Sequence, residues 1–443
     1  MRFAPRYLSL IVRVSTCLAL ATTGLCALAE ADPPRLTIEQ AVQSALQNNP
    51  SLRAARFETQ AACAEADKDK PVIRPRIAAE AQMLLQGPAV TFPRGAEDAL
   101  VLPEQYAQIK LMLDQPIYRA GLGDAWRRYR AMIDAAECRQ RIRTNDVIRD
   151  VRHAYVQCLV ARAMLEVARE AKSVAADHLA LVKRMVESGL SAPRDTLSAE
   201  ADLAEADEGL LRASEGVALA VGDLTRLIGG ETSVTADLLA APDPLPAAPT
   251  TEEAVAHAQA RRPELIALRK AIEAAEAGHA LARLQSSPAF SIRAAAVHQT
   301  PTAFTSQRWA GLGLHMEWPL ADAGKTALDV RLAAARLDQL RAQLDEAESG
   351  ILLEVRDALS RCETALARTT VCAQRLAAAR AALEISRMRY EQRAATLLEL
   401  ASSRLAVTKA DAAWQQAKLD QVMAWADIRH ATAADIAPGT GEP

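Results

Sequence analysis

Few of the residue types that perform chemistry are grouped in this 443-residue sequence. The five cysteines that follow residue 29 are scattered, at Cys63, Cys138, Cys158, Cys362 and Cys372. Even the two nearest are ten residues apart and would point to different sides of a helix, whereas a metal site needs thiols or imidazoles on one face at short spacing. The seven histidines are equally dispersed, and neither HExxH nor GxSxG occurs. We therefore expect no catalytic site, metal ion or cofactor, and we interpret the cysteines as small buried hydrophobic residues.

The first 29 residues have the pattern of a secretory signal peptide. Arg2 and Arg6 precede an apolar stretch that ends in the small-x-small cleavage site at 27–29. Cys26 follows Leu25, whereas a lipid-modified cysteine needs a small residue before it, which disfavours a lipid anchor. Cleavage removes three arginines and no acidic residue, so the formal net charge moves from −3 to −6. Nothing in this charge balance supports nucleic-acid binding.

The remainder of the chain repeats one pattern. PSLRAAR at 50–56 is matched by PELIALR at 263–269, and the same capping-box signature precedes both. QPIYRAG at 115–121 is matched by WPLADAG at 318–324, at an offset ten residues smaller, so the change in length falls in a loop. We expect a signal peptide (1–29), a first structural repeat (30–238), a Pro/Ala-rich linker (239–250), a second structural repeat (251–432) and a C-terminal tail (433–443).

Long stretches without proline predict long helices. No proline occurs between Tyr118 and Ala192 or between Leu320 and Ala437, and Ala, Leu, Glu and Arg dominate both stretches. A helix over 119–187 would be about 100 Å long, several times the width of a compact domain. Leucines of the second stretch follow the spacing of a coiled coil. These helices therefore predict an elongated assembly rather than an ordinary bundle.

Each long stretch is interrupted once, by a predicted helical hairpin. The first interruption is ESGLSAPRD at 187–195, where Gly189 suits a left-handed C-cap. Ser191 and Pro193 suit the N-cap and the first turn of the returning helix. The second interruption, RYEQRAATLLEL at 389–400, has neither glycine nor proline, so we expect a turn of different construction.

Alternation of apolar and polar residues predicts four strands. They lie within residues 76–86, 107–114, 290–296 and 310–317. Each has about ten residues, the length of a tilted strand that crosses a bilayer, with one apolar face and one charged face. The charged positions that we expect to face a lumen are Lys110, Asp114, Arg293 and Glu317. Aromatic residues near the strand ends favour a membrane-interface girdle, and the alternative is a small soluble β-subdomain with one wet face.

A pore built from these strands would need several chains. No apolar stretch of about eighteen residues follows the signal peptide, so only a closed barrel could cross lipid. Four strands cannot close a barrel, and the eight strands of two chains would form a barrel filled by its own side chains. Three chains would supply twelve strands. A homotrimer is therefore the smallest assembly with an aqueous lumen.

These motifs resemble those of the TolC-like outer-membrane efflux proteins. The resemblance rests on the two repeated pairs, on the hairpin SGLSAPRDTLSAEADLAEA and on LTRLIGG at the end of the first repeat, and it covers essentially the whole mature chain. It implies a mostly α fold with a small transmembrane β part, in which a trimer shares a twelve-stranded barrel and a long coiled-coil tunnel. It also implies a passive exit duct in the outer membrane of a Gram-negative bacterium, with a periplasmic adaptor (membrane fusion protein) and an inner-membrane transporter as partners.

The resemblance also implies which residues serve the tunnel's periplasmic end. Adaptor-facing positions at the hairpin tips are Gly189, Leu190, Asp195 and Leu197 in the first tip and Leu400 in the second. An aspartate ring that narrows the tunnel in the family would fall near Leu398, which leaves that constriction in doubt. The candidate gate charges instead are Arg389, Glu391, Arg393 and Glu399. Acidic groups would favour cations and arginines anions, and an ordinary solvated coiled-coil surface is an equal alternative for each.

A periplasmic coiled-coil adaptor or scaffold without a pore is the rival interpretation. Its small β-region would be soluble, whereas the channel needs outer-membrane lipid around its strands. An enzyme ranks behind both, because no nucleophile, base or metal set converges in the sequence. The substrate could be a drug, a metal ion or a secreted polypeptide.

Overall fold

The computed structural model describes residues 36–68, 70–71, 73–94, 97–190, 192–230, 246, 248–392 and 394–436. The predicted signal peptide, nearly all of the linker and the end of the tail lie outside these residues, as does Arg393 among the candidate gate charges. The chain divides into two compact units. Unit 1 comprises Met1–Gln47, Val151–Leu245 and Thr369–Val422, and unit 2 comprises Asn48–Asp150, Pro246–Arg368 and Met423–Pro443.

The prediction of a mostly helical chain with a small β part is confirmed. The helices are α2 (Ile38–Asn48), α3 (Pro50–Lys68), α4 (Leu122–Glu187), α5 (Pro193–Leu227), α6 (Thr251–Arg261), α7 (Pro263–Arg283), α8 (Lys325–Glu391) and α9 (Leu397–Ala431). The strands are β1 (Arg76–Leu85), β2 (Val90–Arg94), β3 (Glu97–Leu102), β4 (Gln105–Tyr118), β5 (Ala289–Gln299) and β6 (Arg308–Glu317).

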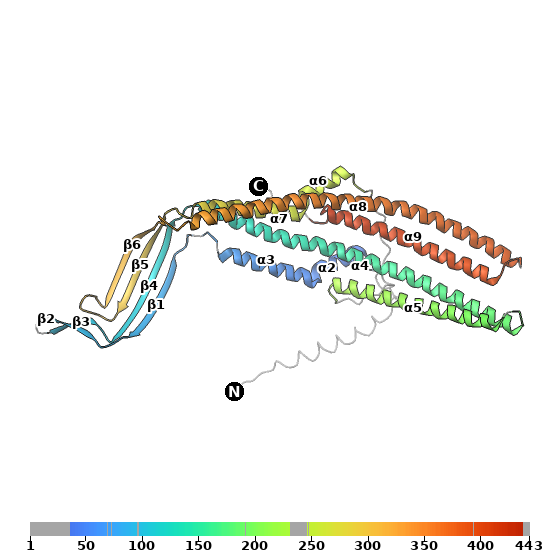
Figure 1. Ribbon diagram of the computed structural model, residues 1–443, viewed down its shortest axis with the longest axis horizontal. Helices are drawn as coiled ribbons and strands as arrows, with labels where there is room; N and C mark the ends of the chain where they lie inside the picture. Colours follow the sequence, from blue (N-terminus) through green and yellow to red (C-terminus); the bar gives the residue numbers. More distant parts are fainter. Residues whose placement is uncertain are drawn as a thin grey trace, which may run out of the picture. The chain divides into compact units, whose positions relative to one another are not determined.

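Two helices have the exceptional length that the proline-free stretches predict. α4 has 66 residues and α8 has 67, so each is about 100 Å long at 1.5 Å per residue. α5 and α9 follow them and have 35 residues each. Figure 1 shows α4 and α5 as one helical hairpin and α8 and α9 as another. The predicted interruptions at 187–195 and 389–400 are therefore the turns of these hairpins.

The two predicted capping boxes start α2 and α6. The Thr250 hydroxyl accepts the Glu253 N–H at 3.3 Å, and the Glu253 carboxylate accepts the Thr250 N–H at 3.1 Å. Thr37 and Gln40 exchange the same two bonds at 3.2 and 3.0 Å. Each box satisfies two backbone donors that a helix start would otherwise leave unpaired.

All four predicted strands form one antiparallel sheet in the order β1-β4-β5-β6, which belongs to unit 2 (Figure 1). A separate hairpin, β2 with β3, follows β1 and was not expected from the alternation. Its two strands pair with each other, and Pro93 lies within β2. An edge strand accepts proline where no ladder N–H is needed.

An alanine-rich core holds the helices of unit 2 together. Its buried members are Ala254, Ala258, Leu265, Ile351, Val355, Ala358, Leu359, Cys362, Ala365, Ala424, Ile428 and Ala431. Small residues at this seam let the helices approach closely. Cys362 lies inside the core, Cys138 and Cys158 are buried as predicted, and Cys63 and Cys372 are half-buried. Burial raises the pKa of Cys158 to about 11, so this thiol stays protonated and unreactive.

Candidate functional site

The first hairpin tip lies in unit 1 and begins with a Schellman motif. Gly189 has φ +72°, its N–H donates to the Val186 carbonyl at 3.0 Å, and the Leu190 N–H donates to the Met185 carbonyl at 2.8 Å. These two bonds satisfy the last carbonyls of α4. The observed φ confirms the left-handed glycine that the sequence predicts. A residue with a Cβ would be strained at that φ.

The returning helix α5 starts differently from the prediction. Pro193 is its first residue, as expected, but the N-cap residue is Ala192 and not Ser191. Proline must take the first helical position because its φ is fixed, which places the cap immediately before it. The Asp195 carboxylate accepts the Ala192 N–H at 3.2 Å. Asp195 therefore closes the turn, beside a leucine that is largely exposed, Leu190 at 76%.

The second tip, also in unit 1, closes without glycine or proline. The Ala394 N–H donates to the Arg389 carbonyl at 2.7 Å, spanning five residues as in the first tip. The N–H of Glu399 donates to the Thr396 hydroxyl at 3.2 Å, so Thr396 caps α9. Sequence reasoning missed this cap, although Thr-x-x-Glu before an apolar stretch is a standard start signal. The predicted difference in construction is confirmed, and Leu400 lies half-buried just inside α9.

The candidate gate charges at the second tip are engaged locally. The guanidinium of Arg389 donates to the Ala394 carbonyl at 3.2 Å, which ties the turn. Arg387 pairs with Glu391 one helical turn later at 3.3 Å, with both side chains exposed. Glu399 has an exposed side chain at the start of α9. At the end of α8 the structure thus pairs Glu391 with Arg387 and turns Arg389 to the Ala394 carbonyl, so these three side chains carry a net charge of +1.

The sheet of unit 2 separates apolar from charged side chains. Residues directly opposite one another in the ladders share a face, and faces alternate along each strand. The pairings of Lys110 with Val297, of Asp114 with Arg293 and of Glu317 with Ala289 place all four predicted charged positions on one face. The other face carries large exposed apolar side chains: Ile77, Met83, Leu85, Ile109, Leu111, Leu312, Leu314 and Met316.

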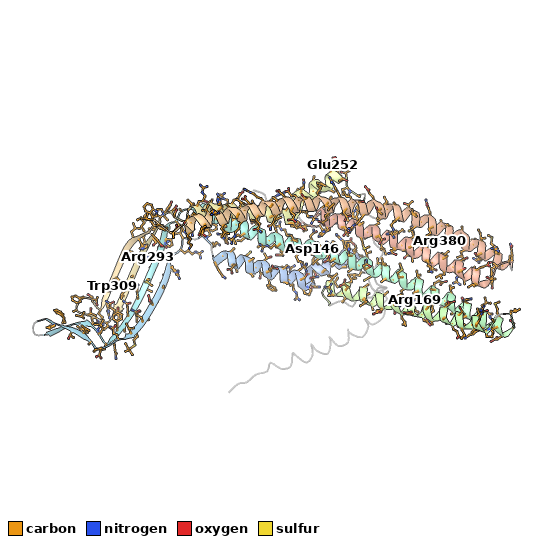
Figure 2. The ribbon with its side chains drawn as sticks, viewed as in Figure 1. Asp146, Arg169, Glu252, Arg293, Trp309 and Arg380 are labelled. Atoms are coloured by element: carbon orange, nitrogen blue, oxygen red, sulfur yellow. The ribbon has the colours of Figure 1, made fainter. Side chains whose placement is uncertain are left out.

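The charged face is ordered in rows that run across the strands. One row contains Asp114 and Arg293, whose carboxylate Oδ2 and guanidinium Nε are 3.5 Å apart. Another is a ladder of amides: Gln82 donates to Gln108 at 3.2 Å, and Gln108 donates to Gln299 at 3.0 Å. Figure 2 shows Arg293 near the end of the sheet from which the helices leave and Trp309 toward the opposite end.

A buried charged cluster in unit 2 was not predicted. Arg262, only 3% exposed, donates through Nε to the Ala431 carbonyl at 2.8 Å and through Nη2 to Glu354. His430 near the end of α9 has Nε2 3.0 Å from Asp146 and Nδ1 3.3 Å from Glu354. The members come from four separate segments, including Asp146 on α4 (Figure 2). No local sequence signal could have united them.

These contacts shift the ionisation of the cluster. Burial alone would lower the pKa of His430, but its hydrogen bonds to Asp146 and Glu354 outweigh burial and raise it. Burial would raise the pKa of Glu354, yet the hydrogen bond from His430 and the charge of Arg262 lower it. The hydrogen bond from His430 also lowers the pKa of Asp146. The cluster therefore favours charged carboxylates around a charged imidazolium.

The described part of the chain contains neither a metal-binding group of side chains nor a membrane-spanning helix. Within it, no group of three or more His, Cys, Asp or Glu side chains is arranged to hold a metal ion. None of its helices combines the length and the apolar character needed to cross a membrane.

Comparison with known proteins gives one consistent result. The profile of the Outer membrane efflux protein family matches residues 41–230 and 254–434. The alkaline protease secretion protein AprF of Pseudomonas aeruginosa is 25% identical over 330 residues, which cover 72% of this chain and 68% of AprF.

Solved structures show the same fold. The outer membrane channel CmeC of Campylobacter jejuni superposes with a TM-score of 0.76 at 16% identity, covering 91% of this chain and 86% of CmeC. The outer membrane protein VceC of Vibrio cholerae superposes with a TM-score of 0.71 at 19% identity, covering 89% of this chain and 95% of VceC. Because the family profile matches well over half of the sequence, in two segments that each end near a hairpin's second helix, the chain belongs to the outer membrane efflux protein family.

Proposed function

We propose that this protein is an outer-membrane exit duct of a tripartite efflux or secretion system. It conducts passively what an inner-membrane transporter and a periplasmic adaptor deliver. The observation that carries the proposal is the two-faced sheet, with exposed large apolar side chains on one face and paired charges on the other. Such a sheet suits a membrane wall between lipid and water.

The sheet cannot serve as that wall alone. β1 and β6 are its edge strands, and each pairs with one neighbour only. An unpaired edge is unacceptable in lipid, since every backbone N–H and C=O there needs a partner. In the proposed homotrimer, β6 of one chain pairs with β1 of the next, and twelve strands close around a lumen lined by Lys110, Asp114, Arg293 and Glu317.

Matching helix lengths support a tandem duplication, and with it the proposed tunnel. Both α2 and α6 have 11 residues, and both α5 and α9 have 35. α4 and α5 would then correspond to α8 and α9, so a trimer would place six similar hairpins around one axis. The proposed repeats are 30–238 and 251–432, separated by the linker and preceded by a signal peptide that directs export.

The hairpin tips are the proposed contact with the adaptor. Leu190 and Leu197 are 76% and 68% exposed, which leaves an apolar surface for a partner. Gly189 and Asp195 set the shape of this tip, and Leu400 belongs to the second. Opening is a population shift that the adaptor drives by binding the open arrangement more tightly. The candidate gate charges are Arg389, Glu391, Arg393 and Glu399.

The proposal is tested by where the mature protein goes and whether it conducts. It should fractionate with outer membranes, require detergent, run as a trimer that dissociates on heating, and give discrete conductance in planar bilayers. A pore-less coiled-coil scaffold would instead be released by osmotic shock and leave bilayers silent. A monomer that stays in water without detergent contradicts the channel.

A further inference from the structure

One row on the charged face of the sheet holds three charges of unequal sign. Arg76 lies directly opposite Asp114 in the β1–β4 ladder, and Asp114 lies directly opposite Arg293 in the β4–β5 ladder. Residues opposite one another in an antiparallel pair have Cβ atoms about 5 Å apart. In the register of the sheet Asp114 thus lies between two arginines, and the row has a net charge of +1 in each chain.

The other rows do not cancel this charge. Glu80 lies opposite Lys110, so that row is balanced. The amide row of Gln82, Gln108 and Gln299 is neutral. Glu317 lies four residues along β6 from the position level with Asp114 and Arg293, which is about 13 Å. At about 0.1 M salt this exceeds the screening length of about 10 Å.

Asp114 is placed to act on passing ions. Its Oδ2 faces Arg293 Nε at 3.5 Å, with the two side chains 41% and 49% exposed, so water and ions reach the pair. Its Oδ1 is buried and, among the described residues, has no hydrogen-bond partner. In the described part of the chain, the Asp114 carboxylate is therefore not part of a hydrogen-bond network that stabilises the sheet.

We infer that Asp114 determines the ion preference of the barrel lumen by cancelling one of the two arginines in its row. This inference rests on the proposed channel function. Removing the carboxylate leaves two positive charges per chain, and six around the proposed trimer. Removing Arg293 leaves a balanced row. The two substitutions therefore have opposite effects on selectivity.

The test is the reversal potential of the purified trimer in planar bilayers under a KCl gradient at about 0.1 M. Asp114→Asn should raise the chloride-to-potassium permeability ratio at least about threefold, the effect of one unit charge at roughly 7 Å through water. Arg293→Gln should lower the ratio. Glu104→Gln, the same charge change at an exposed position before β4, lies about 34 Å along the strand and should leave the ratio near the wild-type value.

The possible outcomes distinguish a failure of the inferred role of Asp114 from a failure of the proposed channel function. A wild-type protein that never conducts overturns both. A conducting channel whose permeability ratio is the same in wild type, Asp114→Asn and Arg293→Gln overturns the role of Asp114 and leaves the duct intact. If Asp114→Asn fails to form the heat-dissociable trimer, the Arg293→Gln ratio decides, and an unchanged ratio refutes the inference.

Discussion

Both ring nitrogens of His430 face carboxylates, Asp146 at 3.0 Å and Glu354 at 3.3 Å. A neutral imidazole has one donor and one acceptor, so only the imidazolium can donate to both. Arg149 and Arg262 are the nearby positive charges that oppose this protonation. The raised pKa shows that the two carboxylates prevail. His430 therefore joins the end of α9 to α4 and α8 only while it is protonated.

This arrangement predicts a stability maximum on the mildly acidic side. A raised histidine pKa gives stability that is complete below the ordinary value and is lost as pH rises through the folded-state value. The lowered pKa values of Asp146 and Glu354 give stability that is lost as pH falls. Together they place the maximum at about pH 4.5 to 6.5. The thermal midpoint of the helical circular dichroism signal should fall as pH rises above this range.

The matched variants for this prediction are His430→Gln and His178→Gln. His430→Gln should lower the midpoint at acidic pH and flatten its dependence between about pH 5.5 and 8. His178 lies 4.0 Å from Asp202 on a partly exposed surface, so its replacement should keep the wild-type slope. A His430→Gln protein with an unaltered slope would show that other groups produce the pH dependence.

The sequence predicted the positions of some functional residues in the fold but not of others. Alternation along β4 and β5 was enough to put Lys110, Asp114 and Arg293 on one face, because strand periodicity is local. Arg262 and His430 could not be united, because 168 positions separate them and their shared contact with Glu354 depends on how helices pack. Thr396 had a local signal, Thr-x-x-Glu, which is easily overlooked in a turn that lacks glycine and proline.

Among the elements, both hairpin tips close with a backbone hydrogen bond that spans five residues, but they hold the turn with different chemistry. Gly189 supplies positive φ in the first tip, whereas in the second the Thr396 cap and the Arg389 guanidinium hold the turn. The tip glycine was predictable from its neighbours. The β2–β3 hairpin was not, since it is a short insertion with a proline, and such pairs depend on turn geometry more than on alternation.

Glycines in the first hairpin should respond oppositely to alanine. Gly189→Ala places a Cβ at φ +72° and should destabilise the tip by about 1 kcal/mol. Gly216 lies inside α5 with open space around its Cα, so Gly216→Ala should stabilise the helix by a similar amount. Amide hydrogen exchange should quicken around 185–195 in the first variant and slow around 210–222 in the second. Equal exchange in both would contradict the strained-glycine explanation.

For the whole molecule, the two-faced sheet decides between a channel and a soluble scaffold. Apolar side chains such as Leu312 and Leu314, 78% and 71% exposed, carry a large penalty in water. This unfavourable free energy disappears when lipid, and not water, covers these side chains. The sequence predicted this two-faced pattern but could not establish barrel closure, because closure depends on pairing between chains that no single chain contains.

Adjacent residues on β4 provide a direct test of which face meets lipid. Leu111 pairs with Ala79 and Ala296 on the apolar face, and Met112 pairs with Ala78 and Ala295 on the charged face. Leu111→Arg should cost about 2–4 kcal/mol if that position lies mid-membrane and should sharply reduce the trimer recovered from outer membranes. Met112→Arg makes the same chemical change one residue away and should assemble normally, because arginine in a polar lumen stays hydrated. A soluble β-subdomain would tolerate arginine at the exposed Leu111, so normal assembly of both variants would argue against a membrane wall. The amount of heat-dissociable trimer in the outer-membrane fraction, compared between the two variants, therefore distinguishes a lipid-facing sheet from a soluble one.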